Sequence, residues 1–160
     1  MRLGTKLAAI AASSLLALGA CGGKKSGSTT TAGSGAGSAT LYDRLGGQPA
    51  VAKVVDDFVG NCAADPRINK FFTAAAGDPQ EMAHFKQMLA DQICAASGGG
   101  CKYTGKSMPE AHKGMGITHD QFMALVEDLQ KALVADGVKD AEQKELLGAL
   151  APLEPDIVGK

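Results

Sequence analysis

A single histidine, His112, stands out in the stretch PEAHKGMGIT, residues 109–118. Met108 lies four residues before it, and Met115 and Ile117 follow it, so its neighbours in sequence are apolar. No second histidine or cysteine stands nearby at the spacing that a zinc site needs. His112 is therefore either a histidine of the hydrophobic core or the ligand of a group that brings most of its own donor atoms.

Haem is a group of this second kind. Its porphyrin supplies four equatorial nitrogens, so the protein has to add only one axial ligand. It is also a large, flat, apolar disc, which suits a helical domain with no Trp, five Phe and two Tyr. Methionines beside the ligand are soft and adapt their shape to such a disc. The chain has no CxxCH motif, which argues against covalent c-type attachment.

The other two histidines carry weaker signals. His84 lies beside Phe85 on a predicted long helix, and we expect it to face solvent, with a pocket as the alternative. His119 follows a predicted N-cap and should be solvated in the first turn of a helix. The positive end of that helix would disfavour the charged form of His119.

The first 20 residues have the features of an export signal. Arg2 and Lys6 form a basic start, and residues 7–18 are an apolar run too short for a comfortable membrane span. The cysteine that follows, Cys21, makes the region resemble a bacterial lipobox, with Cys21 as the lipidated first residue of the mature chain. An ordinary signal peptide ending near a cysteine is the alternative. The lipoprotein hypothesis predicts a protein anchored to a bacterial membrane, facing the periplasm or the cell exterior.

Composition then separates a linker from a folded domain. Residues 21–39 are mostly Gly, Ser, Thr and Ala, which predicts a flexible tether. Residues 40–160 are long enough to bury a core of their own. The signal contains two of the 16 basic residues, so its removal leaves 14 basic against 17 acidic residues. No basic patch stands out, and nucleic acid is not an expected partner.

Three cysteines lie in the folded part, and none has a histidine at ligand spacing. The sequence has no CxxC, HExxH or GxSxG motif. After export the thiols would meet an oxidising compartment, where they tend to pair. Cys94 and Cys101 bracket the turn-forming AASGGG, so we favour this pair, which leaves Cys62 as a buried free thiol. Pairing of Cys62 with Cys94, across two packed helices, is the alternative that spacing does not exclude.

The elements that must position His112 are predicted to be helical throughout. Apolar residues recur every three or four positions from Pro49 to Cys62, and again after Pro79 as far as Ser97. Between these helices we expect a short turn or helix ending at residues 71–72, and a loop containing Gly77.

Capping signals organise the second half. Ser107 and Glu110 resemble a capping box, which predicts a short helix holding His112 and ended by glycines. A second box at Thr118 starts a longer helix that breaks at Asp136-Gly137, and a last helix spans residues 140–150. The stretch CKYTGK, residues 101–106, fits neither helix nor strand by pattern alone.

Several stretches occur in an order and spacing that resemble group I truncated haemoglobins. They are LYDRLGG at 41–47, VVDDF at 54–58, FF at 71–72, YTG at 103–105 and MPEAHKGMGIT at 108–118. APLEPDIV, at 151–158, resembles that family's final helix and tail. The resemblance covers nearly all of residues 41–158.

This resemblance implies an all-α domain, a two-over-two helical sandwich around haem b. The histidine that matches His112 is the proximal ligand of the iron in that family, and Phe72 matches a phenylalanine that packs against the haem. Further cofactor contacts are expected from Phe85, Met88, Leu89, Tyr103, Met108, Met115, Ile117 and Phe122.

On the distal side, where the gas binds, the chain departs from the family. Many members have a tyrosine on the first long helix that hydrogen-bonds oxygen, and the matching residue here is Val59. Other polar positions match Phe85 and Leu89. With Phe58 these residues predict a mostly apolar distal pocket, which only a glutamine, Gln87 or Gln92, would make polar.

Three functions are compatible with this resemblance. The first is reversible binding of oxygen, nitric oxide or carbon monoxide at a His-ligated iron. The second is a haem redox enzyme of the nitric oxide dioxygenase or peroxidase type, supported by an external reductase. The third is electron transfer, with Met88 or His84 as a sixth ligand.

Overall fold

The computed structural model describes residues 38–160. The predicted signal peptide at 1–20, the predicted lipidation site Cys21 and all but the last residues of the predicted tether lie outside the described residues. Within the described part there are eight α-helices and two 3-10 helices, and no strand. They are α1 (Leu41–Leu45), α2 (Gly47–Ala64), η1 (Asn69–Phe71), α3 (Thr73–Ala76), α4 (Pro79–Ala96), α5 (Met108–Ala111), α6 (His119–Ala135), α7 (Asp140–Leu150), η2 (Ala151–Leu153) and α8 (Glu154–Ile157).

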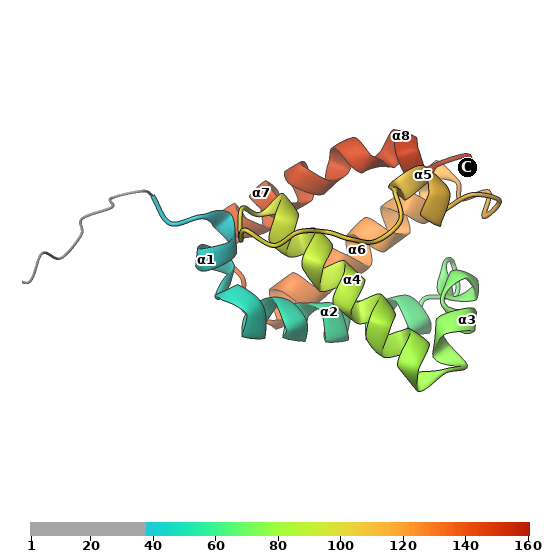
Figure 1. Cartoon of the computed structure of the whole chain (residues 1–160), viewed down its shortest axis with the longest axis horizontal. Coiled ribbons are helices and arrows are strands. Elements are labelled where there is room, and N and C mark those ends of the chain that lie inside the picture. The colour runs from blue at the N-terminus through green and yellow to red at the C-terminus, as the bar shows by residue number, and fades with distance from the viewer. Residues whose placement is uncertain (1–37) are drawn as a thin grey trace, which may run out of the picture. The chain divides into compact units, whose positions relative to one another are not determined.

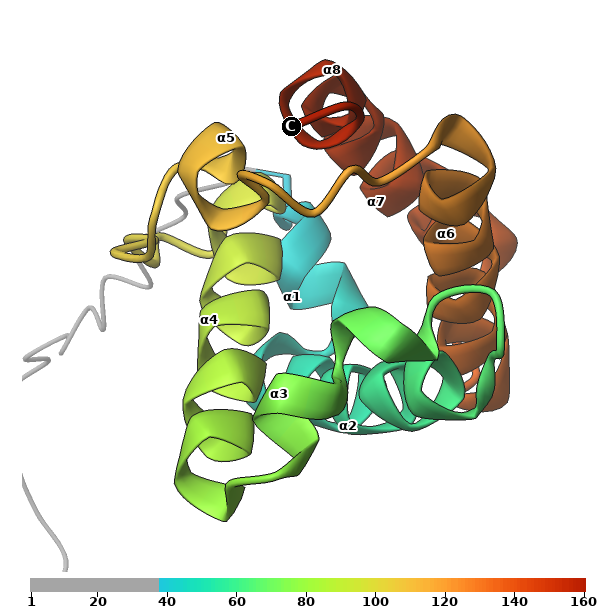
Figure 2. The same cartoon turned by 90° about the vertical axis from the view of Figure 1, so that its right-hand side faces the viewer.

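The long helices form two crossing pairs. Helix α2 packs against both α4 and α6, and α7 contacts α4 and α6 (Figure 1). Figure 2 shows α4 and α6 on opposite sides of α2, with the chain after α5 running across to the start of α6. This arrangement confirms the predicted all-α, two-over-two fold.

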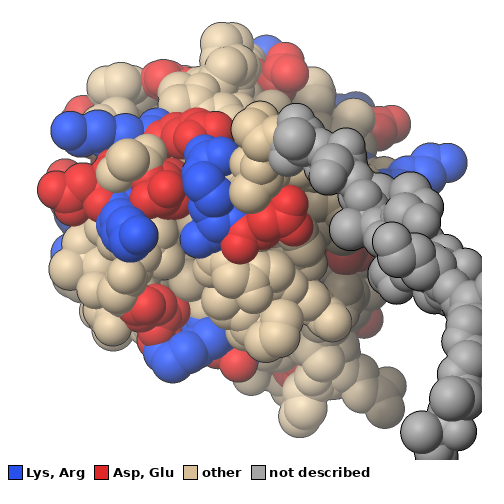
Figure 3. Space-filling view, turned by 90° about the vertical axis from the view of Figure 1, so that its left-hand side faces the viewer, with Lys and Arg blue, Asp and Glu red and all other residues tan. Residues whose placement is uncertain are grey.

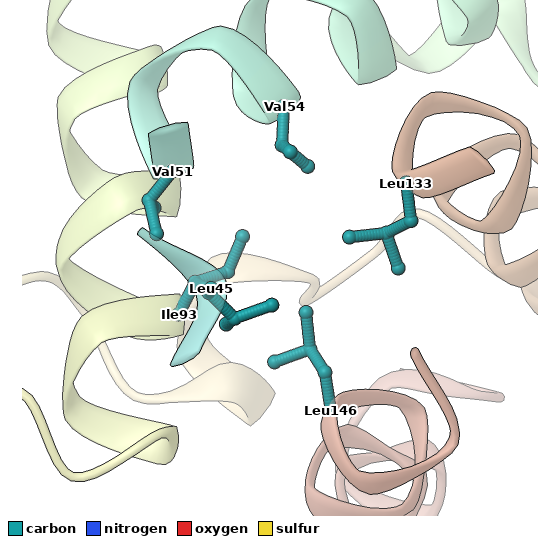
Figure 4. A pocket seen from close by; sticks show the side chains of 6 residues that line it. All are labelled: Leu45, Val51, Val54, Ile93, Leu133 and Leu146. Atoms are coloured by element: carbon teal, nitrogen blue, oxygen red, sulfur yellow. The ribbon is translucent and has the colours of Figure 1, made fainter. Parts of the chain in front are cut away.

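Helical periodicity explains the core. Helix α2 buries one face, made of Val51, Val54, Val55, Phe58, Val59 and Cys62. Each of these valine and phenylalanine side chains contributes about 1.5–3 kcal/mol through burial. Where α1, α2, α4, α6 and α7 meet, six apolar side chains line a void of about 10 Å³. They are Leu45, Val51, Val54, Ile93, Leu133 and Leu146 (Figure 4). Such a void has room for at most one water, and its apolar lining gives a water no partner.

The predicted helix starts are confirmed where a cap was visible in the sequence. Asp78 caps α4 by accepting from the Gln80 N–H at 2.8 Å, and α5 and α6 both begin at capping boxes. Two short helices were not predicted: α1, and α3, which forms where a loop was expected. Neither is long enough to show a helical period.

Polar contacts join elements that are far apart in sequence. Arg44 on α1 reaches α7, where its Nε lies 3.3 Å from Glu142 Oε1 and a second contact is made with Glu145. Basic and acidic side chains are interspersed on the face drawn in Figure 3. None of the described helices is long and apolar enough to cross a membrane.

The favoured disulfide is confirmed. Cys94 and Cys101 are bonded, with their Cα atoms 5.7 Å apart, and the alternative pairing with Cys62 is excluded. Cys94 is buried at the end of α4, whereas Cys101 is exposed in the loop that leads to α5. Cys62 is a fully buried free thiol, and burial raises its pKa to about 12, so it stays protonated at neutral pH.

Candidate cofactor site

His112 sits at the C-terminal end of α5, where capping holds the chain. Helix α5 has only four residues. The Glu110 carboxylate accepts from the Ser107 hydroxyl at 2.5 Å and from its N–H at 3.3 Å, which ties the start of the helix together. At the other end the His112 N–H donates to the Met108 carbonyl at 3.1 Å. The predicted short helix around His112 is therefore confirmed, with His112 as its C-cap.

The ring of His112 is oriented by the same carbonyl. Its Nδ1 lies 2.8 Å from Met108 O, and because a carbonyl only accepts, Nδ1 must carry the hydrogen. In the neutral imidazole the lone pair is then on Nε2. A hydrogen bond from the second ring nitrogen to a carbonyl is the usual way in which proteins orient a histidine that ligates a metal.

The other predicted residues on the His112 side lie in the same segment of chain or just after it. Met108, Met115 and Ile117 are half-buried, and Phe122, in the first turns of α6, is buried. Tyr103 is half-buried, and its hydroxyl donates to the Lys106 carbonyl at 2.9 Å. Since that hydroxyl is used within its own loop, Tyr103 offers an aromatic ring rather than a polar group.

That orientation of Tyr103 depends on a glycine. A Cβ at Gly105 would overlap the hydroxyl and ring of Tyr103, with Cε2 only 2.8 Å away. Burial also raises the pKa of the Tyr103 hydroxyl, so it remains protonated at neutral pH. The glycine of the YTG stretch therefore has a steric explanation: Gly105 leaves room for the ring of Tyr103, which lies over it.

The predicted distal residues come from α2 and α4. Phe58 and Val59 are each 4% exposed, while Phe85 and Leu89 are half-buried. Phe72, also buried, meets Phe85 edge-on with ring centroids 5.9 Å apart. These side chains end in carbon atoms, and the apolar distal pocket that they would form stays a prediction.

Neither glutamine makes a polar contact inside the fold. Gln87 is exposed, and its Nε2 donates to Asp91 Oδ1 at 2.9 Å on the same helix. Gln92 is half-buried and makes no side-chain hydrogen bond within residues 38–160. His84 is exposed, as expected, and Met88 is half-buried. An exposed His84 does not favour its assignment as a sixth ligand.

The prediction for His119 was half right. Its side chain is 63% exposed, as expected for a solvated residue. However, its Nδ1 lies 2.5 Å from Glu154 Oε1, and this hydrogen bond raises the pKa of His119 rather than lowering it. The main partner, Glu154, is 35 residues away in sequence and so was not visible before folding, although the adjacent Asp120 also raises the pKa of His119.

The side chains around His112 fit a flat apolar cofactor that needs one ligand. No group of three His, Cys, Asp or Glu in the described residues could hold a metal ion by side chains alone. Apolar side chains from several elements remain only half-buried, which leaves apolar surface for a cofactor to cover. They include Met82, Phe85, Met88 and Leu89 of α4, Met108, Met115 and Ile117 around α5, Leu125 and Val126 of α6, and Leu147 and Leu150 of α7.

Some of these residues lie on predicted helices but were not predicted to form part of the site. Met82, Leu125 and Leu150 belong to this group, and all three pack against the buried core. Their helical spacing predicts the buried face of a helix. The spacing does not predict which residues of that face remain half-buried, because this depends on how the neighbouring helices pack.

Comparison with known proteins shows the family. A profile described as bacterial-like globin matches residues 40–158. Group 1 truncated hemoglobin GlbN of Mycolicibacterium paratuberculosis is 39% identical over 119 residues, which cover 74% of this chain and 84% of that protein. Group 1 truncated hemoglobin of Tetrahymena pyriformis is 34% identical over 121 residues, which cover 76% of this chain and 96% of that protein.

Solved structures agree with the sequence comparison. The Tetrahymena pyriformis truncated hemoglobin in its Fe(III) form superposes with a TM-score of 0.70 at 34% identity, covering 76% of this chain and all of that one. The 2/2 hemoglobin of Synechococcus sp. PCC 7002, solved in the cyanomet state with covalently attached heme, has a TM-score of 0.68 at 32% identity and the same coverage. Of the three functions considered, these relatives support the ligand-binding globin. The chain belongs to the bacterial-like globin family as a group 1 truncated haemoglobin, with haem iron as its cofactor and diatomic gases as its ligands.

Proposed function

We propose that this protein holds haem b non-covalently through Nε2 of His112 and binds oxygen or another diatomic gas on the opposite, apolar side. The observation that supports this assignment is the 2.8 Å hydrogen bond between His112 Nδ1 and Met108 O. This bond leaves the lone pair of Nε2 available to a metal, on a half-buried ring. Both residues of the bond belong to the motif MPEAHKGMGIT, which resembles the family. His84 and His119 are both exposed and lack such a bond to a carbonyl.

Two sets of apolar side chains would enclose the haem in this proposal. Tyr103, Met108, Met115, Ile117 and Phe122 would pack against the porphyrin on the side of His112. Phe85, Met88 and Leu89 of α4 would contact it together with Phe72, which packs on Phe85. Their carbon surfaces exclude water from the cofactor. Haem iron supplies an open coordination position for a diatomic ligand when it is bound.

The distal wall would distinguish between gases. Phe58, Val59, Phe85 and Leu89 contribute no hydrogen-bond donor from their side chains. Oxygen draws electron density from ferrous iron and gains from a donor, whereas carbon monoxide needs one less. We therefore propose that oxygen is held weakly and leaves quickly.

Replacing His112 tests the assignment. In His112→Gly the protein should lose its haem to an excess of apomyoglobin at least ten times faster than the wild type, since the only axial donor is gone. Added imidazole should occupy the space left by the ring and slow this loss. His84→Gly is the control, because it makes the same substitution at an exposed histidine; its cost in helix propensity is the larger one, since His84 lies inside α4 and His112 at the end of α5. A His112→Gly protein with an unchanged ferrous spectrum would show that another residue is the ligand.

We also propose that the globin is exported and tethered to a bacterial membrane by lipid on Cys21. The support is the signal-like segment at 1–20 and the Gly/Ser/Thr-rich stretch at 21–39, with the globin domain proper at 40–160. The family match begins only at residue 40, so these segments are additional to the globin.

Fractionation and mass spectrometry test the tether. Wild-type protein should appear in the membrane fraction with a lipidated first residue, and Cys21→Ser should be released or keep its signal. Ser28→Ala, in the tether, is the control and should stay in the membrane fraction. Wild-type protein that is soluble and carries no lipid would refute this proposal.

A further inference from the structure

We propose that the C-terminal segment, Glu154–Lys160, is a strap that positions the turn after His112 and thereby the proximal ligand. We call this segment the strap. The inference rests on the proposed function only in taking His112 as the axial ligand. It assigns a positioning role to residues more than 40 positions further along the chain.

Two backbone hydrogen bonds join the strap to the turn. Gly159 N–H donates to the Ile117 carbonyl at 3.0 Å, and Gly116 N–H donates to the Lys160 carbonyl at 2.9 Å. The bonds run in opposite directions between the same two short stretches of chain. Such a reciprocal pair fixes both the distance and the register between the strap and the turn.

The turn needs an external partner because of its own composition. Gly114 and Gly116 have φ values of +80° and +59°, which favour glycine, and glycine loses the most conformational freedom when it is ordered. One local backbone bond, from Met115 N–H to the His112 carbonyl at 3.1 Å, is formed within the turn. The strap supplies the other two.

Helix α5 depends on the strap in the same way. A four-residue helix is too short to be stable alone. Its main helical neighbour among the described elements is α8, which forms the first part of the strap. The two labelled helices lie beside each other at one end of the molecule in both views (Figures 1 and 2).

A side-chain contact completes the strap. His119 Nδ1 lies 2.5 Å from Glu154 Oε1, so the beginning of α6 is joined to the beginning of α8. The turn from His112 to α6 is therefore held at its glycines by the tip of the strap and at its far end by Glu154. A shift of the strap would move the backbone that carries His112.

Two variants of the full-length holoprotein test this inference. Deletion of residues 159–160 removes the strap's tip, and Glu154→Gln weakens its side-chain contact. Asp56→Asn is the matched control for the second, because Asp56 forms an exposed ion pair with Lys86, at 2.9 Å, away from the strap. We measure haem transfer to apomyoglobin, the iron–histidine stretching band of the ferrous protein by resonance Raman, and amide hydrogen exchange at Met115 to Ile117.

The deletion should accelerate amide exchange in the turn and haem loss by about tenfold each, as expected for two lost backbone bonds. It should also shift or broaden the iron–histidine band. Glu154→Gln should act in the same direction with a smaller effect, and Asp56→Asn should leave all three readouts unchanged. Unchanged amide exchange, or faster exchange with an unchanged iron–histidine band, would overturn the inference.

A wrong assignment of His112 as the haem ligand would give a different result from a wrong assignment of the strap. If His112 is not the ligand, the iron–histidine band persists in His112→Gly, whatever the strap does. Amide exchange in the turn needs no haem and can be measured on the apoprotein as well. The two hypotheses are therefore tested separately.

Discussion

The two sides of the haem site are built in different ways. The proposed distal side comes from α2 and α4, each 18 residues long, which pack against each other. The side of His112 comes from the four-residue α5 and the loops around it. The first is positioned by side-chain packing. The second is positioned by caps, a disulfide, glycine turns and the strap.

Because of this difference, substitutions on the two sides should change different properties: the stability of the fold on one side and the retention of haem on the other. Distal side chains such as Phe58 and Val59 belong to the main core, so shortening them to alanine should mainly lower the free energy of unfolding. Residues near His112, such as Met115, are half-buried and contribute less to the core. Changes there should affect the retention of haem more than the folding of the apoprotein.

The largest effect should come from the distal core. Phe58→Ala should lower the free energy of unfolding of the apoprotein by about 3–5 kcal/mol, because a buried aromatic ring is lost and a cavity remains. Met115→Ala, on the other side, should cost markedly less because its side chain is half-buried. Urea unfolding of both variants measures this contrast. Equal losses would mean that the two sides share one core.

Next in size is the disulfide between Cys94 and Cys101, which links α4 to the loop before α5. Its removal should cost about 2–3 kcal/mol, as expected for closing so short a loop. Urea unfolding of Cys94→Ser/Cys101→Ser measures this loss, and reduced wild-type protein should match the double variant. Haem loss should also accelerate, since the loop to α5 is freed at one end. Identical unfolding of oxidised and reduced wild type would contradict this prediction.

A polar residue in the distal wall should act mainly on the gas. Val59→Tyr adds a donor next to the proposed gas site, and a hydrogen bond to a charged group contributes roughly 1.5–3 kcal/mol. Oxygen release, measured by stopped flow, should therefore slow by about 10- to 150-fold, with carbon monoxide less affected. Val59→Phe is the matched control, since it adds the ring without the hydroxyl. Equal release rates in the two variants would show that the hydroxyl does not reach the ligand.

The smallest effect should be the pH dependence of the contact between His119 and Glu154. Because the hydrogen bond to Glu154 raises the pKa of His119, its contribution is fully present below pH about 6.5 and is lost as the pH rises through the raised pKa. His119→Gln should therefore lower the melting temperature more at pH 6 than at pH 9. A loss that is the same at both pH values would indicate a contact that does not depend on charge.

Much of the fold was predictable from local pattern. The long helices α2, α4 and α6 carry apolar residues at helical spacing, and prolines, glycines and capping residues mark their ends. His112 was singled out by its apolar neighbours and by the motif that resembles truncated haemoglobins. The local disulfide was favoured but not decided, because spacing alone allowed Cys94 to pair with Cys62.

Other features were decided only by the tertiary structure. Helices α1 and α3 are shorter than a helical period can reveal, and α8 was expected only from the family resemblance of residues 151–158. Helix packing places Gln87 on the solvent side of α4, and His119 meets Glu154 on a different helix. Local sequence encodes backbone propensity and the periodicity of a face. Contacts between segments far apart in the chain depend on how the helices pack, so the pKa shift of His119 and the strap across the turn after His112 appear only once the chain is folded.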